Sequence, residues 1–444
     1  MLRRTCSAIA VAASLLSACV YAPEAAAPPP SSHAGMMQGE MPPEMHAQHM
    51  AMMTAHAPKP EAPRNLSTTV SPEAVGFDSA RLKKLDDYMA QVVADGRVAG
   101  MTTLLARHGQ VVEFKTYGKA SLETGAPITK DSIFRIYSMT KPITGVAMMI
   151  LFEQGKWRLD DPVTRYVPEF KNLRVVKSIK KDGSLELEDM VRPPTMREIM
   201  SHTAGFGYGL AEEHPVDKLY RSEKVLSASS LKEMIDRTAT VPLMFQPGTN
   251  WSYSSSVDIQ GYIVEKLSGQ SLDVYFDEHI FKPLGLKDTG YEVSTTVLPR
   301  RVAGYGFADG KWTNATYLSM SLPYAAGSLY STVDDLLAWE KAFFGDKVVS
   351  AASRAAMTTD QGEKYGFGLL IDDLGGHKNI WHNGGINGFA THMVNFQDDG
   401  LIVITLANLE SARSTRLGTE IARIWLGLPA PPPPAALVPV TVAP

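Results

Sequence analysis

A serine and a lysine three residues apart are the first side chains in this chain that could do chemistry. They stand in the segment Phe134-Arg135-Ile136-Tyr137-Ser138-Met139-Thr140-Lys141-Pro142. A serine hydroxyl becomes an effective nucleophile only when a base takes its proton. A lysine can be that base only when it is neutral, and burial or a second cation nearby lowers its pKa toward that state. Ser138 and Lys141 could therefore form a nucleophile and its base.

The residues around this pair predict a helix that begins beside Ser138. Apolar residues recur at helical spacing after the pair: Ile143, Val146, Ala147, Ile150 and Leu151. Pro142 is tolerated only in the first turn of such a helix. The spacing puts Ser138 and Lys141 on one face. Ser138 then lies beside free backbone N–H groups and the positive end of the helix dipole, which favours negative charge on a substrate oxygen.

The Ser-x-x-Lys pattern is weak by itself, and it occurs three times in this chain. Ser178 and Lys181 lie in a charged run, 177–182, where we expect a solvated loop. Ser229 and Lys232 lie at the expected start of a helix, with the serines as capping residues. Only the first match follows an apolar run and opens an apolar helix, so it is the candidate.

Composition places the chain among ordinary globular proteins. It has 444 residues, of which 44% are hydrophobic and 20% charged, and its net charge is −4. This length is enough for one large domain or two smaller ones with real cores. The charge leaves no electrostatic footprint for nucleic acid, so we expect no nucleic-acid partner.

The N-terminus has the features of an export signal over residues 1–19. Arg3 and Arg4 precede an apolar run, which ends in Leu16-Ser17-Ala18-Cys19. These four residues resemble a bacterial lipobox, which implies cleavage before Cys19 and a lipid on its sulfur. A plain secretory signal, in which Cys19 has no role, is the alternative. We expect an exported protein of the cell envelope, anchored to a membrane through lipid. Cys6 is the only other cysteine, so no disulfide is expected.

Two segments have compositions that cannot bury a core. Residues 20–70 are rich in Met, His, Pro and Ala, which predicts a disordered linker between membrane and domain. Thioethers and imidazoles could bind copper(I) there, but no regular ligand spacing is present, and we favour the low-complexity linker. We expect no metal and no cofactor. Residues 429–444 are a proline-rich, disordered tail.

The domain between them, 71–428, is predicted to be α+β. Alternating patterns predict strands near both of its ends, at 98–106, 110–118, 365–371, 379–382, 389–396 and 401–407. Helical patterns are predicted at 77–94, 196–201, 257–268, 272–280, 331–344 (with Ser331 or Thr332 as cap) and 411–426. We expect one antiparallel sheet built from both chain ends, helices flanking it, and an inserted, mostly helical lobe. A site would form in the groove between sheet and lobe.

Two further stretches could work with Ser138. The first, Trp251-Ser252-Tyr253-Ser254-Ser255, carries a tyrosine that could shuttle protons beside a lysine, although it could also be an aromatic anchor for its loop. The second, His382-Asn383-Gly384-Gly385, is expected to end a strand, and its glycines would let backbone N–H groups approach a substrate oxygen. An ordinary glycine-rich hairpin turn is the alternative.

Taken in order, Ser138-x-x-Lys141, Tyr253-x-Ser255 and His382-x-Gly384 resemble the three motifs of the serine β-lactamase and penicillin-binding superfamily. Further segments between about 75 and 427 resemble its class C-like branch: Leu159-Asp160-Asp161-Pro162, Ser201-His202-Thr203-Ala204-Gly205, Pro283-Leu284-Gly285-Leu286-Lys287-Asp288-Thr289 and Ser331-Thr332-Val333-Asp334-Asp335-Leu336. That branch includes class C β-lactamases, D-Ala-D-Ala carboxypeptidases and family VIII carboxylesterases. The motif sequences of this chain resemble those of the family VIII carboxylesterases most.

The resemblance implies a β-lactamase-like fold and a role for each motif residue. Ser138 would attack the substrate carbonyl and form an acyl-enzyme, while Lys141 and Tyr253 handle protons. The N–H groups of Ser138 and Gly385 would form the oxyanion hole. His382 would border the substrate acid group or orient Tyr253. Ser255 and Gly384 would complete the substrate site, and His202 looks structural in that family.

Two departures from the β-lactamase motifs favour an esterase or a peptidase. His382 replaces the lysine typical of true β-lactamases, and Ser255 replaces an asparagine. The esterase branch itself often has an apolar residue at 255 and tryptophan at 382. We expect a serine hydrolase, most of all a carboxylesterase of small or short-acyl esters. The alternatives are a D-Ala-D-Ala carboxypeptidase or weak β-lactamase and, from another class, a non-catalytic penicillin-binding-like sensor or envelope scaffold.

Overall fold

The computed structural model describes residues 69–96, 98–291, 298–308, 311–315, 324–410 and 414–429. The expected signal peptide with Cys19, nearly all of the expected linker over 20–70, and the tail after residue 429 lie outside the described residues. Within the described ranges, no helix combines the length and the apolar character that a membrane crossing requires.

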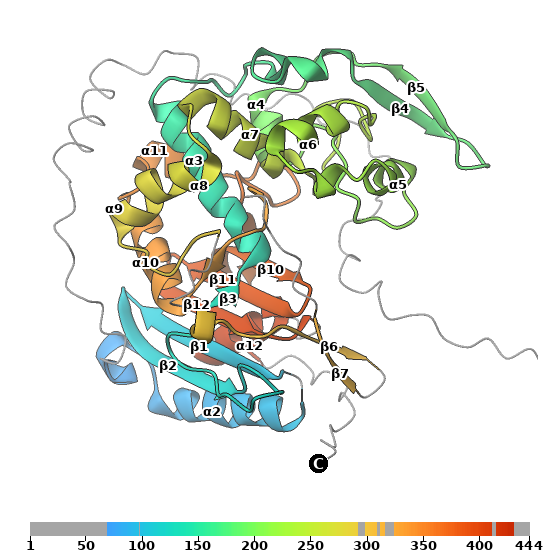
Figure 1. The fold of residues 1–444 in the computed structure, drawn as a ribbon. Coiled ribbons are helices and arrows are strands. Elements are labelled where there is room, and N and C mark those ends of the chain that lie inside the picture. The colour runs from blue at the N-terminus through green and yellow to red at the C-terminus, as the bar shows by residue number, and fades with distance from the viewer. Residues whose placement is uncertain are drawn as a thin grey trace, which may run out of the picture. The chain divides into compact units, whose positions relative to one another are not determined.

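A six-stranded antiparallel sheet joins the two ends of the domain, as predicted. Its strand order is β2-β1-β12-β11-β10-β9 (Figure 1). The strands are β1 (Gly100–Arg107), β2 (Gln110–Gly118), β9 (Leu370–Leu374), β10 (His377–Ile386), β11 (Phe389–Phe396) and β12 (Leu401–Ala407). The N-terminal hairpin meets the C-terminal strands where β1 pairs with β12, with Thr103 opposite Thr405. Alternating side chains on these strands therefore serve two cores, one on each face of the sheet.

One face of the sheet is covered by the first and last long helices. These are α2 (Ser79–Ala94) and α12 (Ser414–Leu426), and Figure 1 shows them together beneath the strands. Leu85 of α2 and Trp425 of α12 pack in one buried cluster with Leu105 and Val403 of the sheet. The opposite face, which includes Leu104 and Ile404, belongs to the core of the helical part.

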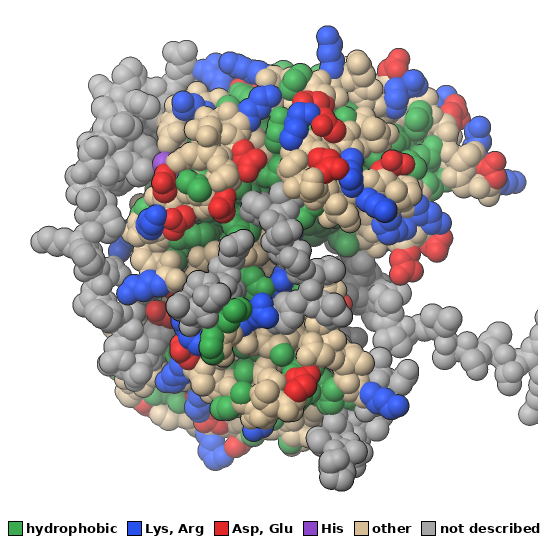
Figure 2. All heavy atoms as spheres, in the orientation of Figure 1, with side chains coloured by type: hydrophobic (Ala, Val, Ile, Leu, Met, Phe, Trp, Pro, Cys, Tyr) green, Lys and Arg blue, Asp and Glu red, His purple; other side chains and the backbone are tan. Residues whose placement is uncertain are grey.

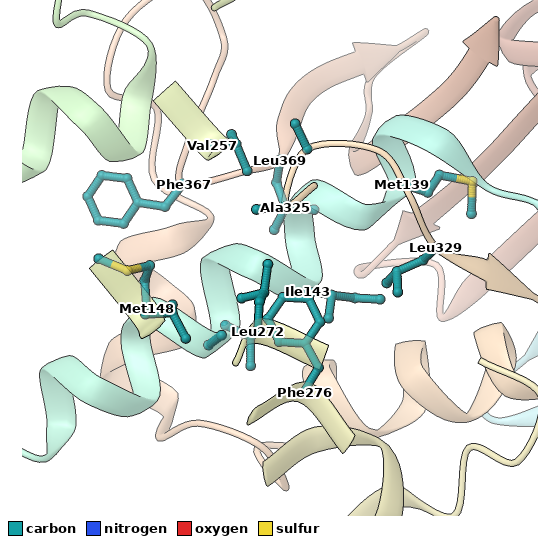
Figure 3. Packing of buried hydrophobic residues seen from close by; sticks show 14 of the residues in the cluster. Met139, Ile143, Met148, Val257, Leu272, Phe276, Ala325, Leu329, Phe367 and Leu369 are labelled. Carbon is teal, nitrogen blue, oxygen red and sulfur yellow. The ribbon is translucent and has the colours of Figure 1, made fainter. Parts of the chain in front are cut away.

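The helical part is built around α3 (Thr140–Glu153), which is buried on nearly every side. The other α-helices are α4 (Met196–Ser201), α5 (Pro215–Ser222), α6 (Leu231–Thr238), α7 (Ser256–Ser268), α8 (Leu272–Phe276), α9 (Lys282–Leu284), α10 (Val333–Phe344) and α11 (Ala351–Met357). Figure 3 shows Ile143 and Met148 of α3 packed with Val257 of α7 and with Leu272 and Phe276 of α8. A helix that is apolar on all sides is stable only when other parts of the protein surround it, and α3 is surrounded in this way.

Shorter elements link these helices. The 3₁₀ turns are η1 (Pro72–Val75), η2 (Tyr137–Met139), η3 (Val163–Arg165), η4 (Pro168–Asn172), η5 (Val225–Ser227) and η7 (Leu298–Arg300), and one π-helical turn, η6 (Asp277–Phe281), follows α8. Three two-stranded pairs are β3 (Phe134–Arg135) with β8 (Tyr330–Ser331), β4 (Arg174–Ile179) with β5 (Leu185–Asp189), and β6 (Tyr305–Ala308) with β7 (Lys311–Asn314).

The β4–β5 hairpin corrects one expectation. The loop predicted over 177–182 is wrong, because Ser178 lies in β4 and Lys181 at the turn. Lys177 and Ser178 both bond the carboxylate of Glu186 on the facing strand, at 2.8 and 2.9 Å. Both faces of this hairpin are largely solvated, so its sequence lacks the alternation that marks a half-buried strand. Basic and acidic side chains are interspersed over it (Figure 2).

The strand predictions near the C-terminus need two corrections. The strand predicted over 365–371 begins only at Leu370, because Gly368 turns with a positive φ of 81° at a place where a Cβ would lie 2.8 Å from the carbonyl oxygen of Lys141. The strand predicted over 379–382 continues to Ile386. The His382-Asn383-Gly384-Gly385 motif therefore lies inside β10 rather than at its end, and Asn387 and Gly388, both with positive φ, make the turn.

The predicted helices lie close to the observed ones. Helix 196–201 agrees with α4, and helix 257–268 with α7, which begins one residue earlier. The helix predicted over 331–344 begins at Val333, and Thr332 is its N-cap through a bond from the backbone N–H of Asp335. The helix predicted over 272–280 becomes a π-helical turn after Phe276.

Candidate active site

Ser138 lies in the short 3₁₀ turn η2, directly before α3. Tyr137, the residue before it, has a left-handed φ of 44°, which is unusual for a residue with a side chain and marks a sharp turn. The residues that lead into this turn, β3 and Ile136, are called the entry strand here. They are fixed from two sides, since the N–H of Ile136 bonds the carbonyl of Leu329 and the carbonyl of Ile136 accepts a bond from Thr391 Oγ1 at 3.2 Å. Ser138 itself remains half-buried.

Lys141 is fully buried next to Ser138, which is the condition under which it could serve as a base. Its Nζ lies 2.9 Å from Ser138 Oγ and donates to the carbonyl of Ala326 at 2.8 Å. Burial lowers the pKa of Lys141 to about 7, although the negative charge of Asp258 acts in the opposite direction. A lysine in this state is neutral in much of the protein near pH 7, so its lone pair can accept the serine proton.

Tyr253 completes a group of three polar side chains. It lies in the loop before α7, its hydroxyl is hydrogen-bonded to Ser138, and Lys141 Nζ lies 4.6 Å from its ring centroid. Burial raises the pKa of Tyr253 far above its ordinary value of 10, so the resting hydroxyl is neutral. Tyr253, more than a hundred positions along the chain from Ser138 and Lys141, is thus within reach of both.

His202 holds the loop that carries Tyr253. It ends α4 with a left-handed φ of 63°, and its carbonyl accepts the N–H of Ser252 at 3.0 Å. Its Nδ1 accepts the N–H of Ser254 at 3.2 Å, and its ring packs on Tyr253 with centroids 4.9 Å apart. Burial, helped by Lys141 and His382, lowers its pKa well below 6.5, so the ring is neutral. Through these contacts His202 positions Tyr253.

Asp258, Ala326 and Tyr208 are site residues that sequence reasoning missed. Asp258 Oδ1 accepts the backbone N–H of Ala326 at 3.0 Å, and the carbonyl of the same residue accepts from Lys141. Burial raises the pKa of Asp258 to about 6. The Tyr208 ring lies 5.4 Å from Lys141 Nζ and 5.7 Å from the Tyr253 ring. Asp258 could have been noticed in the sequence, because it is an acidic residue between apolar residues at the start of a predicted helix. Nothing in the sequence marks Ala326.

Ser255, expected at the substrate, is bonded within the helical part of the domain. It is fully buried, its Oγ lies 3.2 Å from the hydroxyl of Tyr220, and its N–H bonds the carbonyl of Gly207. It thereby ties the start of α7 to the helical lobe, and a direct contact with substrate stays a prediction.

The third motif lies on the free part of strand β10. β9 pairs with β10 only as far as Trp381, so from His382 onward β11 is the one strand neighbour in the described chain. Gly384 faces the entry strand, where a Cβ at position 384 would lie 2.0 Å from the carbonyl oxygen of Ile136. Gly385 is exposed. Unpaired backbone of this kind can offer an N–H to a substrate oxygen.

His382 is buried on the same face of β10 as Gly384. Its Nδ1 lies 2.7 Å from the carbonyl oxygen of Asn383, and burial, with a contribution from Lys141, lowers its pKa to about 3. It is therefore a neutral ring and gives no positive charge to a substrate carboxylate. Its roles beside the substrate acid group or toward Tyr253 stay predictions.

Ser138 is thus a nucleophile with a buried amine base, Lys141, and it also bonds the hydroxyl of Tyr253. Over the described ranges, no group of three or more His, Cys, Asp or Glu side chains is placed to hold a metal ion. The chemistry that these groups can support is acyl transfer through the Ser138 oxygen, with proton transfer to and from Lys141 and Tyr253.

A mixed α/β domain with one antiparallel sheet and a Ser-x-x-Lys helix at its edge defines the β-lactamase-like class of serine hydrolases. The chain belongs to the Beta-lactamase family, whose family model matches residues 85–424. The fold class and the superfamily predicted from the motifs are thus confirmed.

Relatives in this family carry several activities in their names. The chain is 30% identical to Esterase EstB of Burkholderia gladioli over 346 residues, which cover 69% of this chain and 84% of that protein. It is 33% identical to a putative D-alanyl-D-alanine carboxypeptidase of Salmonella agona over 238 residues, half of each chain.

Solved structures share the fold. EstCE1, described as a hydrolase with promiscuous acyltransferase activity, superposes with a TM-score of 0.65 at 23% identity, covering 78% of this chain and 98% of that one. Simvastatin synthase LovD from Aspergillus terreus has a TM-score of 0.68 at 19% identity, with the same coverage. At these identities the likeness concerns the fold alone.

Proposed function

We propose that the protein is a carboxylesterase that cleaves small or short-acyl esters through an acyl-enzyme on Ser138. The observation that carries this proposal is the 2.9 Å approach of Lys141 Nζ to Ser138 Oγ, at a lysine whose pKa burial lowers to about 7. A neutral amine at this distance is a base within hydrogen-bond reach of the nucleophile.

The proposed reaction has two steps, acylation and hydrolysis. Ser138 Oγ attacks the ester carbonyl while Lys141, directly or through Tyr253, takes the hydroxyl proton. The N–H groups of Ser138 and Gly385 hold the oxyanion. The proton then passes to the leaving alcohol, and the acyl group stays on Ser138. Water attacks the acyl carbon, gives its proton back to the same pair, and releases the acid with Ser138 restored.

The ester preference is supported by the charge of the site and by the esterase named among the relatives. β-Lactams and D-Ala-terminated peptides carry a carboxylate, and the ring of His382 is uncharged. Peptidase or weak β-lactamase activity is the second candidate. It is favoured by the similarity to the Salmonella carboxypeptidase, which extends over half of each chain.

The test compares wild type with Ser138→Ala on p-nitrophenyl esters from acetate to octanoate, with a chromogenic cephalosporin in parallel. We expect ester turnover that falls at least a thousandfold in the variant, with an unchanged melting temperature, because only a small hydroxyl is removed. Cephalosporin cleavage faster than ester cleavage would move the protein to the β-lactamase branch. Loss of both activities in the wild type, with no covalent labelling by fluorophosphonate or penicillin probes, would favour the sensor or scaffold alternative.

We further propose export and lipid attachment at Cys19, on the lipobox-like residues that precede it. Metabolic labelling with a palmitate analogue in a bacterial host should mark the wild type and leave Cys19→Ala unmarked. Equal labelling of both chains would exclude Cys19 as the attachment site.

A further inference from the structure

Four side chains beside Tyr253 have buried polar atoms without a hydrogen-bond partner in the part of the chain that the structure describes. They are Trp251 Nε1, His202 Nε2, Tyr365 OH and His382 Nε2. The rings of Trp251, His202 and Tyr365 form a triangle with centroid separations of 6.0, 4.9 and 5.8 Å. His382 lies next to it, 6.4 Å from the Tyr365 ring. We call these four residues the polar cage.

The polar cage offers both donors and an acceptor. Nδ1 of His202 accepts the N–H of Ser254 at 3.2 Å and lies 2.9 Å from Ser254 Oγ, which can donate to it. A ring nitrogen that accepts the backbone N–H carries no proton, so the neutral ring has its proton on Nε2. Nδ1 of His382 faces a carbonyl oxygen, which can only accept, so this ring carries its proton on Nδ1 and its Nε2 is an acceptor. The indole of Trp251 donates, and the hydroxyl of Tyr365 both donates and accepts.

These atoms need a small, uncharged ligand. A buried polar group without a partner has lost its hydrogen bonds to water and gained none in return, so a native protein rarely gathers four of them in one place. A water molecule accepts two hydrogen bonds and donates two, which matches donors from His202 and Trp251 with an acceptor on His382. All four polar atoms are closed to bulk solvent, so the cage suits water and excludes a larger alcohol.

Tyr253 connects the polar cage with the reacting atoms. Its ring packs on His202 at 4.9 Å and lies 6.4 Å from Trp251, while its hydroxyl bonds Ser138. We propose that the polar cage binds ordered water beside Tyr253 and supplies the water that hydrolyses the acyl-enzyme. This inference rests on the proposed function, since it needs an acyl group on Ser138.

The consequence is a choice between two acceptors. Water from the polar cage attacks the acyl carbon, the Ser138 ester bond breaks, and the acid leaves while Ser138 regains its proton. An alcohol from bulk solvent would attack from outside the cage and yield a new ester instead. Damage to the cage should therefore slow hydrolysis and leave transfer to an alcohol unchanged.

Tyr365→Phe tests this, because it removes one hydroxyl and keeps the ring that packs on His202. The assay uses p-nitrophenyl butyrate with methanol as competing acceptor and measures the ratio of methyl butyrate to butyrate. We expect the ratio to rise about fivefold, the size of effect that loss of one hydrogen bond to an ordered water gives, with an unchanged p-nitrophenol burst rate. Trp251→Phe should shift the ratio in the same direction.

Tyr275→Phe is the matched control, since it also removes a buried tyrosine hydroxyl that has no hydrogen-bond partner among the described residues, but on α8. Its ratio should equal that of the wild type. A crystal structure of the full chain should show water bonded to Tyr365 OH and His382 Nε2. An unchanged ratio in both cage variants with a normal burst, or a cage without water in the crystal, would overturn the inference. Absence of any Ser138-dependent burst would instead refute the proposed function, and the crystal structure would then decide on the cage alone.

Discussion

Replacement of Asp258 by asparagine is the most informative single change in this site. Asp258 is linked to Lys141 through the backbone of Ala326, whose N–H donates to the carboxylate and whose carbonyl accepts from the amine. An asparagine oxygen can still accept the N–H of Ala326, so the backbone that positions Lys141 is kept. The change removes a negative charge and little else.

The size of the effect follows from electrostatics. Two unit charges in contact at an effective dielectric constant of about 20 interact by about 4 kcal/mol, and the energy falls with their separation. For partners linked through Ala326 we expect a smaller interaction, equivalent to about one to two pKa units. In the wild type this interaction raises the pKa of Lys141 against the larger effect of burial, which brings it to about 7. Without the carboxylate, the ammonium form is less favoured, so the pKa of Lys141 falls further.

The pH profile of kcat/KM for a p-nitrophenyl ester measures this shift. In the wild type, activity should rise as Lys141 loses its proton near pH 7. In Asp258→Asn, the rise should move to lower pH by about one to two units, and the plateau should fall by up to about tenfold because a less basic amine is a weaker base. Asp258→Ala, which also frees the N–H of Ala326, should lose activity at every pH. If kcat/KM of Asp258→Asn rises at the same pH as in the wild type, or at a higher pH, this account of Lys141 is refuted.

Three further changes test other parts of the structure. Tyr253→Phe should lower kcat for esters by about 10²-fold or more with an unchanged melting curve, and near-normal turnover would leave Tyr253 only an anchoring role. Gly384→Ala puts a Cβ 2.0 Å from the Ile136 carbonyl and should lower both the melting temperature and ester turnover, whereas Gly385→Ala, with 3.6 Å to its nearest neighbour, should melt like the wild type. Burial raises the pKa of Glu340 to about 7, so the folded state holds its proton longer than the unfolded chain and stability falls as pH rises from about 4.5 to 7, by up to ~3 kcal/mol. Glu340→Gln should flatten that decline in urea unfolding, and an equal decline in both proteins would contradict the assignment.

Local patterns made much of the fold predictable. Short apolar runs separated by short turns identified the β1–β2 hairpin and strands β11 and β12, because β1, β11 and β12 are buried on both faces of the sheet. The order of elements along the chain then required the two ends to share one sheet, which β1 and β12 do. Ser138 and Lys141 were visible because helical spacing is itself a local property.

The remaining parts of the site depend on contacts that no local pattern encodes. Ala326 contributes a carbonyl and an N–H, and a backbone group leaves no signature in the residue type. Tyr365 lies in a segment that alternates like a strand, yet Gly368 diverts the chain toward α3 and brings the tyrosine to His202. Strand β10 runs past the expected end because its glycines accommodate the entry strand rather than a turn.

Ala326 also explains why a lysine can serve as an oriented base here. A neutral amine has two N–H groups and one lone pair, and free rotation about its last bond would spread that lone pair over three directions. The carbonyl of Ala326 binds one N–H at 2.8 Å, and the Ala326 peptide is itself fixed by Asp258. Rotation is thereby restricted at an atom 2.9 Å from Ser138 Oγ. The same backbone residue thus orients the base that we propose and links it to the carboxylate that tunes its pKa, so changes at Asp258 should separate orientation from basicity: asparagine alters only the second, and alanine alters both.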